Sequence, residues 1–212
     1  MSGLFITFEG PDGAGKTTQL NRVAEWLEQQ GFAFVRTREP GGTKISDSIR
    51  TLLLNPENSE MANETEVLLY AASRAQLVSE VILPALEDGK IVLCDRYVDA
   101  SLAYQGYGLA YPVQQIAAIN RFATTGVQPD RTYLLDIPVE IGLRRVFQKR
   151  GSAPDRIERK DITYHKSVRK GFLTLAKKEP ERFCLIDARQ GEDAVFSVIQ
   201  SDLKRHFSLG GN

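Results

Sequence analysis

The sequence is poor in the residues that build disulfide frameworks and metal clusters. Its 212 residues contain two cysteines and two histidines, too few for either kind of site. Cys94 and Cys184 each lie in an apolar run, so we expect both to be buried strand residues. His165 and His206 lie on polar helical stretches and suggest no metal cluster.

Net charge is also missing, because 27 Lys and Arg residues balance 27 Asp and Glu residues. A general nucleic-acid binder is expected to carry a basic excess, so any phosphate chemistry must come from local clusters. No apolar run approaches the roughly 18 residues of a membrane span, and the first residues lack the pattern of a secretory signal. We therefore expect a cytoplasmic protein that contacts neither nucleic acid nor membrane.

Short apolar runs alternate with longer stretches of helical periodicity. The pattern predicts five strands, at residues 4–8, 32–35, 91–93, 131–135 and 183–186. It predicts helices at residues 17–30, 44–54, 64–86 (bent near Pro84), 112–125, 139–150, 163–178 and 193–207. Such alternation requires crossovers and a parallel sheet covered by helices on both faces. We predict an α/β fold in one domain, residues 1–212, with ligands at the carboxyl ends of the strands.

A phosphate-binding motif follows the first predicted strand. Residues 10–17 match G-x-x-x-x-G-K-[ST] and open a helix, as a P-loop requires. The glycines let consecutive N–H groups point at an anion, and the helix N-terminus adds donors and a positive dipole. Lys16 can reach the β- and γ-phosphates, and the Thr17 hydroxyl can ligate Mg²⁺. The expected ATP-binding residues are Gly10, Pro11, Asp12, Gly13, Ala14, Gly15, Lys16 and Thr17.

Charged residues follow two further predicted strands at the same sheet edge. Asp95 ends an apolar strand and can hold Mg²⁺ together with Thr17, often through water. Arg38 and Arg96 follow the second and third strands. Arginine forks bind phosphate bidentately, which suits a phosphate monoester acceptor, although surface ion pairing is the alternative.

One helix carries a pair that suits a base. Tyr70 and Arg74 are four residues apart and share a helical face. An aromatic ring beside a guanidinium can stack on a base and bond its edge. Taken alone, such a pair is more often packing.

Four segments together resemble bacterial thymidylate kinases of the P-loop nucleoside monophosphate kinase family. They are residues 8–18, 37–43, 95–105 and 155–158, and the resemblance runs from residue 4 to about 207. It implies a P-loop NTPase fold and a homodimer. It also implies transfer of the γ-phosphoryl of MgATP to dTMP, giving dTDP and ADP.

The resemblance also implies residue roles. Asp12 approaches the deoxyribose 3′-OH, Arg96 and Arg38 hold the dTMP phosphate, and Tyr104 crowds the 2′ position. The residues implied to bind dTMP are Asp12, Arg38, Tyr70, Arg74, Arg96, Ser101, Tyr104 and Gln105, and those implied to be catalytic are Lys16, Arg96 and Arg156. Tyr70 replaces the usual phenylalanine and Ala100 a frequent serine, which could shift base preference.

A basic segment predicts a lid. Residues 144–160 contain seven basic and two acidic residues, interrupted by Gly151–Pro154. The variable P-loop positions carry no positive charge, so we expect a mobile lid at about 149–161 to deliver an arginine to the transferring phosphoryl group. Arg156 is the favoured residue, solvated in the open state. The alternative is a solvated charged face.

Two alternatives stay open at this point. One is a kinase for another deoxynucleotide or a nucleoside; the other is a nucleotide-dependent switch or ATPase. The sequence has no Asn-Lys-x-Asp motif of a GTPase switch. The apolar residues that could serve a dimer or the core equally are Leu68, Leu69, Val78 and Ile82.

Overall fold

A computed structural model describes residues 3–150, 154–207 and 209. Residues 151–153, at the centre of the predicted lid, lie outside the described residues. The described part contains a five-stranded sheet in the order β2-β3-β1-β4-β5, with every neighbouring pair parallel. The strands are β1 (Leu4–Glu9), β2 (Phe34–Arg38), β3 (Ile91–Asp95), β4 (Arg131–Asp136) and β5 (Phe183–Asp187). The predicted fold class is confirmed.

The strand register places the carboxyl ends of the three strands that carry the motifs side by side at one edge of the sheet. Asp95 on the central β3 is opposite both Phe8 on β1 and Arg38 on β2. The second strand lies at 34–38 rather than at 32–35 as predicted. It is an edge strand whose polar residues Arg36 and Arg38 are exposed, so apolar patterning located only its first half.

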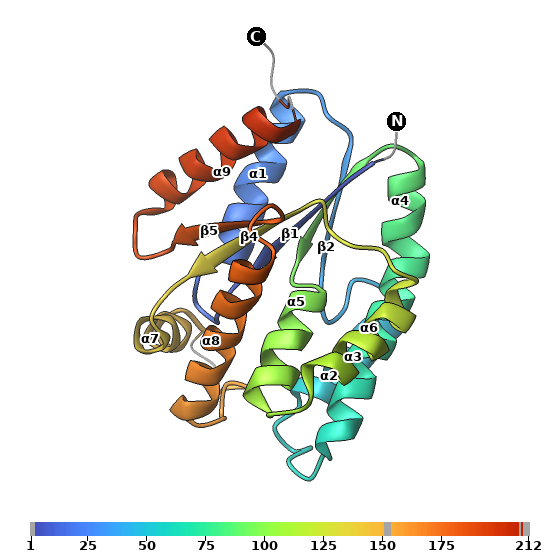
Figure 1. Ribbon diagram of the computed structural model, residues 1–212, viewed down its shortest axis with the longest axis vertical. Coiled ribbons are helices and arrows are strands. Elements are labelled where there is room, and N and C mark those ends of the chain that lie inside the picture. The colour runs from blue at the N-terminus through green and yellow to red at the C-terminus, as the bar shows by residue number, and fades with distance from the viewer. Residues whose placement is uncertain (1–2, 151–153, 208, 210–212) are drawn as a thin grey trace.

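Helices cover both faces of the sheet. They are α1 (Lys16–Gln29), α2 (Lys44–Leu54), α3 (Asn63–Leu77), α4 (Leu83–Glu87), α5 (Val98–Ser101), α6 (Val113–Thr124), α7 (Val139–Arg150), α8 (Ile162–Lys178) and α9 (Glu192–Phe207). Figure 1 shows α1 and α9 together on one side of the sheet and α5 and α8 on the other. The sequence prediction omitted α5 and the π-helical turns η2 (Leu102–Gly108) that continue it.

The helix predicted at 64–86 is continuous but not uniform. Between α3 and α4, the segment η1 (Val78–Ile82) forms wider π-helical turns just before Pro84. Proline has no N–H to donate and its ring crowds the carbonyl four residues earlier, which explains a wider turn there. Residues Asn63–Glu87 are long and apolar enough to cross a membrane by length and composition. Within this segment, Leu77, Val78 and Ile82 are buried against the sheet, and 39% of its most apolar window is buried.

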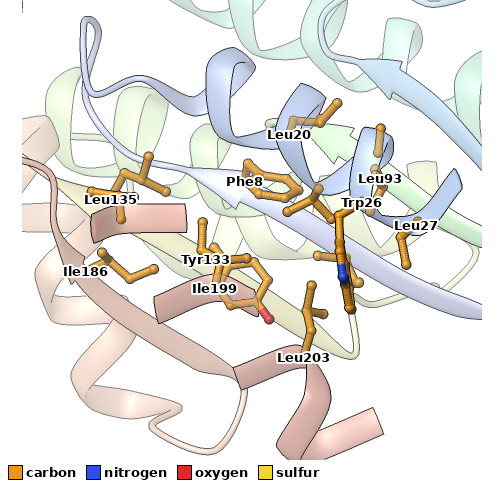
Figure 2. Packing of buried hydrophobic residues seen from close by; sticks show 14 of the residues in the cluster. Phe8, Leu20, Trp26, Leu27, Leu93, Tyr133, Leu135, Ile186, Ile199 and Leu203 are labelled. Carbon is orange, nitrogen blue, oxygen red and sulfur yellow. The ribbon is translucent and has the colours of Figure 1, made fainter. Parts of the chain in front are cut away.

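The largest apolar cluster lies between the sheet and the layer of α1 and α9 (Figure 2). The rings of Phe8 and Tyr133, from neighbouring strands, pack at a tilt of 42° with 5.6 Å between their centroids. Leu20, Trp26 and Leu27 of α1 and Ile199 and Leu203 of α9 close over them. Cys94 is fully buried, as predicted, while Cys184 on the edge strand β5 is only half-buried. His165, predicted on a polar stretch, is also buried.

Candidate active site

The loop between β1 and α1 is held by glycines in conformations that other residues rarely adopt. Gly10 and Gly13 have φ of 137° and 74°. A Cβ on Gly13 would lie 2.1 Å from the carbonyl oxygen of Gly142 on α7. Conversely, a Cβ on Gly142 would lie 2.3 Å from the carbonyl oxygen of Asp12. The loop is therefore pressed against α7, the helix that leads into the predicted lid.

Lys16 lies buried across this loop. Its Nζ donates to the carbonyl oxygens of Gly10 and Pro11, both at 3.0 Å. Burial, together with the positive charge of Arg96, lowers its pKa to about 8. An anion in the loop would favour the charged lysine and replace the carbonyl contacts.

Thr17 and Asp95 lie side by side at the carboxyl ends of β1 and β3. The Thr17 hydroxyl donates to a carboxylate oxygen of Asp95. Mg²⁺ keeps several waters and takes one or two protein oxygens plus substrate phosphates, so this hydroxyl–carboxylate pair fits it. Among the described residues there is no group of three or more His, Cys, Asp or Glu side chains that could hold a metal ion.

Beside the loop lies a cavity of about 130 Å³. Its walls come from the P-loop, α3, the α5–η2 segment and residues 155–158, which are far apart in the sequence. Seven residues predicted to bind the acceptor line it: Asp12, Tyr70, Arg74, Arg96, Ser101, Tyr104 and Gln105. The fold thus gathers most of the predicted acceptor site in one place.

Arg96 joins the cavity to the P-loop. It adopts a positive φ of 71° and donates to the carbonyl oxygen of Gly10 at 3.1 Å and to Asp12 Oδ1 at 2.6 Å. Tyr104 donates to the other oxygen of Asp12 at 2.8 Å. Burial opposes ionisation of Asp12, but Arg96 and Lys16 outweigh it and lower the pKa of this carboxyl. Asp12 therefore pairs with Arg96, the residue predicted to hold the acceptor phosphate.

Arg74 is 1% exposed and its guanidinium is fully engaged. It donates to Glu39, to the Ser101 hydroxyl at 2.9 Å, to the Tyr97 carbonyl oxygen at 2.9 Å and to Asn120. These contacts use all five N–H donors of an arginine. Burial raises the pKa of Glu39 and outweighs the lowering effect of Arg74.

A second buried charge pair lies behind residues that line the cavity. Arg156 Nη1 is 2.8 Å from Glu66 Oε2, and the two side chains are 8% and 1% exposed. Arg156 also donates through Nε to the Leu53 carbonyl oxygen at 2.8 Å. Glu66 Oε1 accepts from Gln105 Nε2 at 2.9 Å. The residues next to Arg156, namely Asp155, Ile157 and Glu158, line the cavity.

Comparison with known proteins supports the predicted family. Residues 8–199 match the family model of thymidylate kinase. The chain belongs to the thymidylate kinase family. The thymidylate kinase of Exiguobacterium sibiricum is 53% identical over 203 residues, covering 96% of this chain and 95% of that protein. That of Geotalea uraniireducens is 50% identical over 212 residues, covering 98% and 100%.

A solved structure shares the fold. The crystal structure of thymidylate kinase from Ehrlichia chaffeensis has a TM-score of 0.76 at 33% identity, covering 95% of this chain and 99% of that one. The sequence-based assignment to a family of ATP-dependent nucleoside monophosphate kinases is thereby confirmed.

Two expectations about this family member's arginines differ from the structure. Arg38 does not line the cavity; it is exposed and pairs with Asp47 at 3.2 Å. Successive side chains of an edge strand alternate between faces, and Arg38 shares the exposed side with Arg36. Arg50 of α2 lines the cavity instead. Arg156, which we expected to be solvated in the open state, is here buried in a pair with Glu66.

Several site residues of this thymidylate kinase family member were missed from the sequence. They are Glu39, Arg50, Glu66, Asn120 and Gly142. Two of them had a signal. Glu39 is inside the segment 37–43 that carried the resemblance, and Glu66 is four residues before Tyr70 on the same helix face.

Proposed function

We propose that this chain transfers the γ-phosphoryl group of ATP to the 5′-phosphate of dTMP, giving dTDP and ADP. The observation that carries this proposal is the position of Arg96. It lines the acceptor cavity and also bonds the carbonyl oxygen of Gly10 in the P-loop. An acceptor phosphate on Arg96 lies next to the donor phosphates in the loop.

On the donor side, the P-loop amides and Lys16 bind the ATP phosphates. Thr17 and Asp95 would hold Mg²⁺, which neutralises phosphate charge when bound. Phosphoryl transfer needs positioning and charge neutralisation rather than a covalent intermediate. Lys16 therefore acts on charge that develops during transfer.

On the acceptor side, the dTMP phosphate replaces Asp12 as the partner of Arg96. This phosphate is already ionised, so no strong general base is needed. Tyr70 stacks on thymine, and Ser101, Arg74 and Gln105 contact its edge. Every N–H group of Arg74 already donates a hydrogen bond, so a thymine carbonyl must share one of these donors with its present acceptor. The shared donor is the one that bonds the Ser101 hydroxyl, because Ser101 also lines the cavity.

The lid proposal changes in one respect. The segment at about 149–161 still brings positive charge toward the phosphates, but Arg156 would first have to leave Glu66. Arg159 is exposed on the same segment. We therefore assign the lid charge to Arg159 and a positioning role to Arg156.

The chain folds as a single catalytic domain. Two copies form a homodimer, which works in the cytoplasm. Large apolar side chains on two helices that pack together support the dimer. Leu68 on α3 is 58% exposed and Phe122 on α6 is 88% exposed. Of the four residues weighed for core or dimer, Val78 and Ile82 belong to the core.

A coupled assay of ADP formation tests the proposal. It compares dTMP, dUMP, dCMP, dAMP, dGMP and UMP as acceptors for the same enzyme and ATP. We expect dTMP to give the highest kcat/KM, and Arg74→Ala to raise its KM and flatten the ranking between dTMP and dCMP. Equal rates across the panel would contradict the assignment of dTMP.

A further inference from the structure

The amide of Gln105 is oriented by a neighbour that can only accept hydrogen bonds. Glu66 lies on α3, is fully buried, and its Oε1 accepts from Gln105 Nε2 at 2.9 Å. A carboxylate has no proton to donate. The nitrogen of the Gln105 amide must therefore face Glu66, whichever way the amide would otherwise turn.

This orientation decides what Gln105 offers to a ligand. Gln105 is 2% exposed and lines the cavity. With its nitrogen committed to Glu66, the other branch of the amide, a carbonyl oxygen, is what remains for the cavity. Thymine carries an N3–H donor between two carbonyls, whereas cytosine has an acceptor at N3. A carbonyl oxygen bonds the first and repels the second.

We propose that Glu66 is a specificity-determining positioning residue, which fixes the Gln105 amide so that its carbonyl accepts the N3–H of the base. This inference rests on the proposed dTMP site. Glu66 touches no substrate; it acts through Gln105. Cytosine is rejected because its N3 faces an acceptor and Gln105 cannot rotate without placing two acceptors against each other.

Arg156 completes the arrangement from the opposite side. Its guanidinium is 2.8 Å from the second oxygen of Glu66 and is itself buried. The ion pair offsets the cost of burying the two charges away from water. The residues next to Arg156 in the sequence line the cavity. The Glu66 carboxylate therefore both holds the segment 155–158 in place, through Arg156, and orients the Gln105 amide.

The test is the ratio of kcat/KM for dTMP to that for dCMP in Glu66→Gln. A glutamine at 66 can donate as well as accept, so Gln105 becomes free to turn its NH₂ group toward the cavity. We expect the ratio to fall about 10- to 100-fold, mainly through a higher KM for dTMP with kcat little changed. The double variant Glu66→Gln/Arg156→Met removes both charges, so no unpaired charge remains if the single variant folds poorly. It should show the same fall.

Two matched variants separate this effect from a structural one. Arg156→Lys keeps a cation beside the Glu66 acceptor but loses the contact to the Leu53 carbonyl oxygen, so the ratio should stay within about threefold even if stability falls. In a Gln105→Ala background, Glu66→Gln should change the ratio no further. A folded Glu66→Gln enzyme with an unchanged ratio, or an equal fall without Gln105, would overturn the inference. If Gln105→Ala itself left the KM for dTMP and the ratio unchanged, the proposed base site would be wrong instead.

Discussion

Two buried ionisable residues lie at the P-loop, Glu9 just before it and Lys16 near its end. Burial, reinforced by the negative charge of Asp99, raises the pKa of Glu9 to about 8. Burial also lowers the pKa of Lys16 to about 8. The two shifts change the pH dependence of the unfolding free energy in opposite directions. Glu9 lowers stability as the pH rises toward about 8, and Lys16 raises stability as the pH rises above about 8.

Glu9→Gln should remove a pH dependence of stability. Between its usual pKa of 4.5 and about 8, Glu9 is protonated when folded and ionised when unfolded. The unfolded state then binds fewer protons, so stability falls as pH rises through this window. Lys16 adds stability with rising pH only above about 8. Melting temperatures of the variant and parent from pH 5.5 to 7.5 should diverge in favour of Glu9→Gln.

The exposed Glu25→Gln is the control for that measurement. Its melting temperatures should run parallel to those of the parent. Parallel curves for Glu9→Gln as well would show that Glu9 is ionised in the folded protein at neutral pH.

Lys16→Ala should lose catalysis rather than acceptor binding. Removing a preorganised charge from a phosphoryl-transfer site costs about 3–4 kcal/mol, or roughly 10²- to 10³-fold in kcat. Calorimetric binding of dTMP should change little, because Lys16 contacts the P-loop carbonyls. The exposed Lys178→Ala serves as the control. Near-normal turnover of Lys16→Ala would contradict the P-loop assignment.

At the scale of elements, the site depends on how closely α7 and the segment 155–158 dock. Helix α7 meets the P-loop where Gly13 and Gly142 face each other without side chains. The segment 155–158 is fastened to the end of α2 through the carbonyl oxygens of Leu53 and Leu54. The P-loop and the cavity wall are therefore each set by an element distant in sequence.

Gly142→Ala should destabilise the protein although alanine favours helices. Helix propensity alone would add about 1 kcal/mol. The new Cβ would lie 2.3 Å from the Asp12 carbonyl oxygen, and overpacking of this kind costs about 1–3 kcal/mol. We expect a lower melting temperature and a higher KM for ATP. Gly191→Ala, where no atom lies within 4 Å of the added Cβ, is the control.

Arg156→Ala and Arg159→Ala should fail in different ways. The first leaves Glu66 buried without its ion pair, which costs about 3–5 kcal/mol, so melting temperature falls and the KM for dTMP rises. The second removes an exposed charge, so stability holds while kcat falls, up to about 10³-fold. Steady-state kinetics with thermal melts distinguish them. A fall in kcat alone for Arg156→Ala would return the lid charge to that residue.

At the scale of the whole molecule, the sheet was predictable because its inner strands β1, β3 and β4 are largely apolar and buried on both faces. The predicted bounds of the helices at 44–54 and 139–150 match those of the structure, because the apolar residues of these helices are regularly spaced. Short α5 has too few residues to show a period. Motif residues such as Lys16, Asp95 and Arg96 were found because their spacing is local. Pairings such as Arg74 with Glu39 join residues 35 apart, and only the folded chain reveals them.

Phe122→Glu should convert the proposed homodimer to monomers. A charge in place of a fully apolar contact cannot be buried in an interface without a large desolvation cost. Sedimentation velocity of parent and variant measures the change directly. Phe147→Glu, at a 55% exposed position on α7, is the control and should leave the mass unchanged. A parent that sediments as a monomer would contradict the proposed dimer.

The helices on the two faces of the sheet contribute unequally to the acceptor cavity. Among the described residues, α9 supplies no side chain to the acceptor cavity, and its inner face belongs to the apolar cluster of Figure 2. The α3, η2 and 155–158 side holds the substrate pocket and the buried pair of Arg156 and Glu66. Engineering for heat tolerance commonly loses activity where flexibility or strain serves the site. In this enzyme, α9 and the α9-facing side of α1 are where a designer can stiffen the protein while leaving turnover alone.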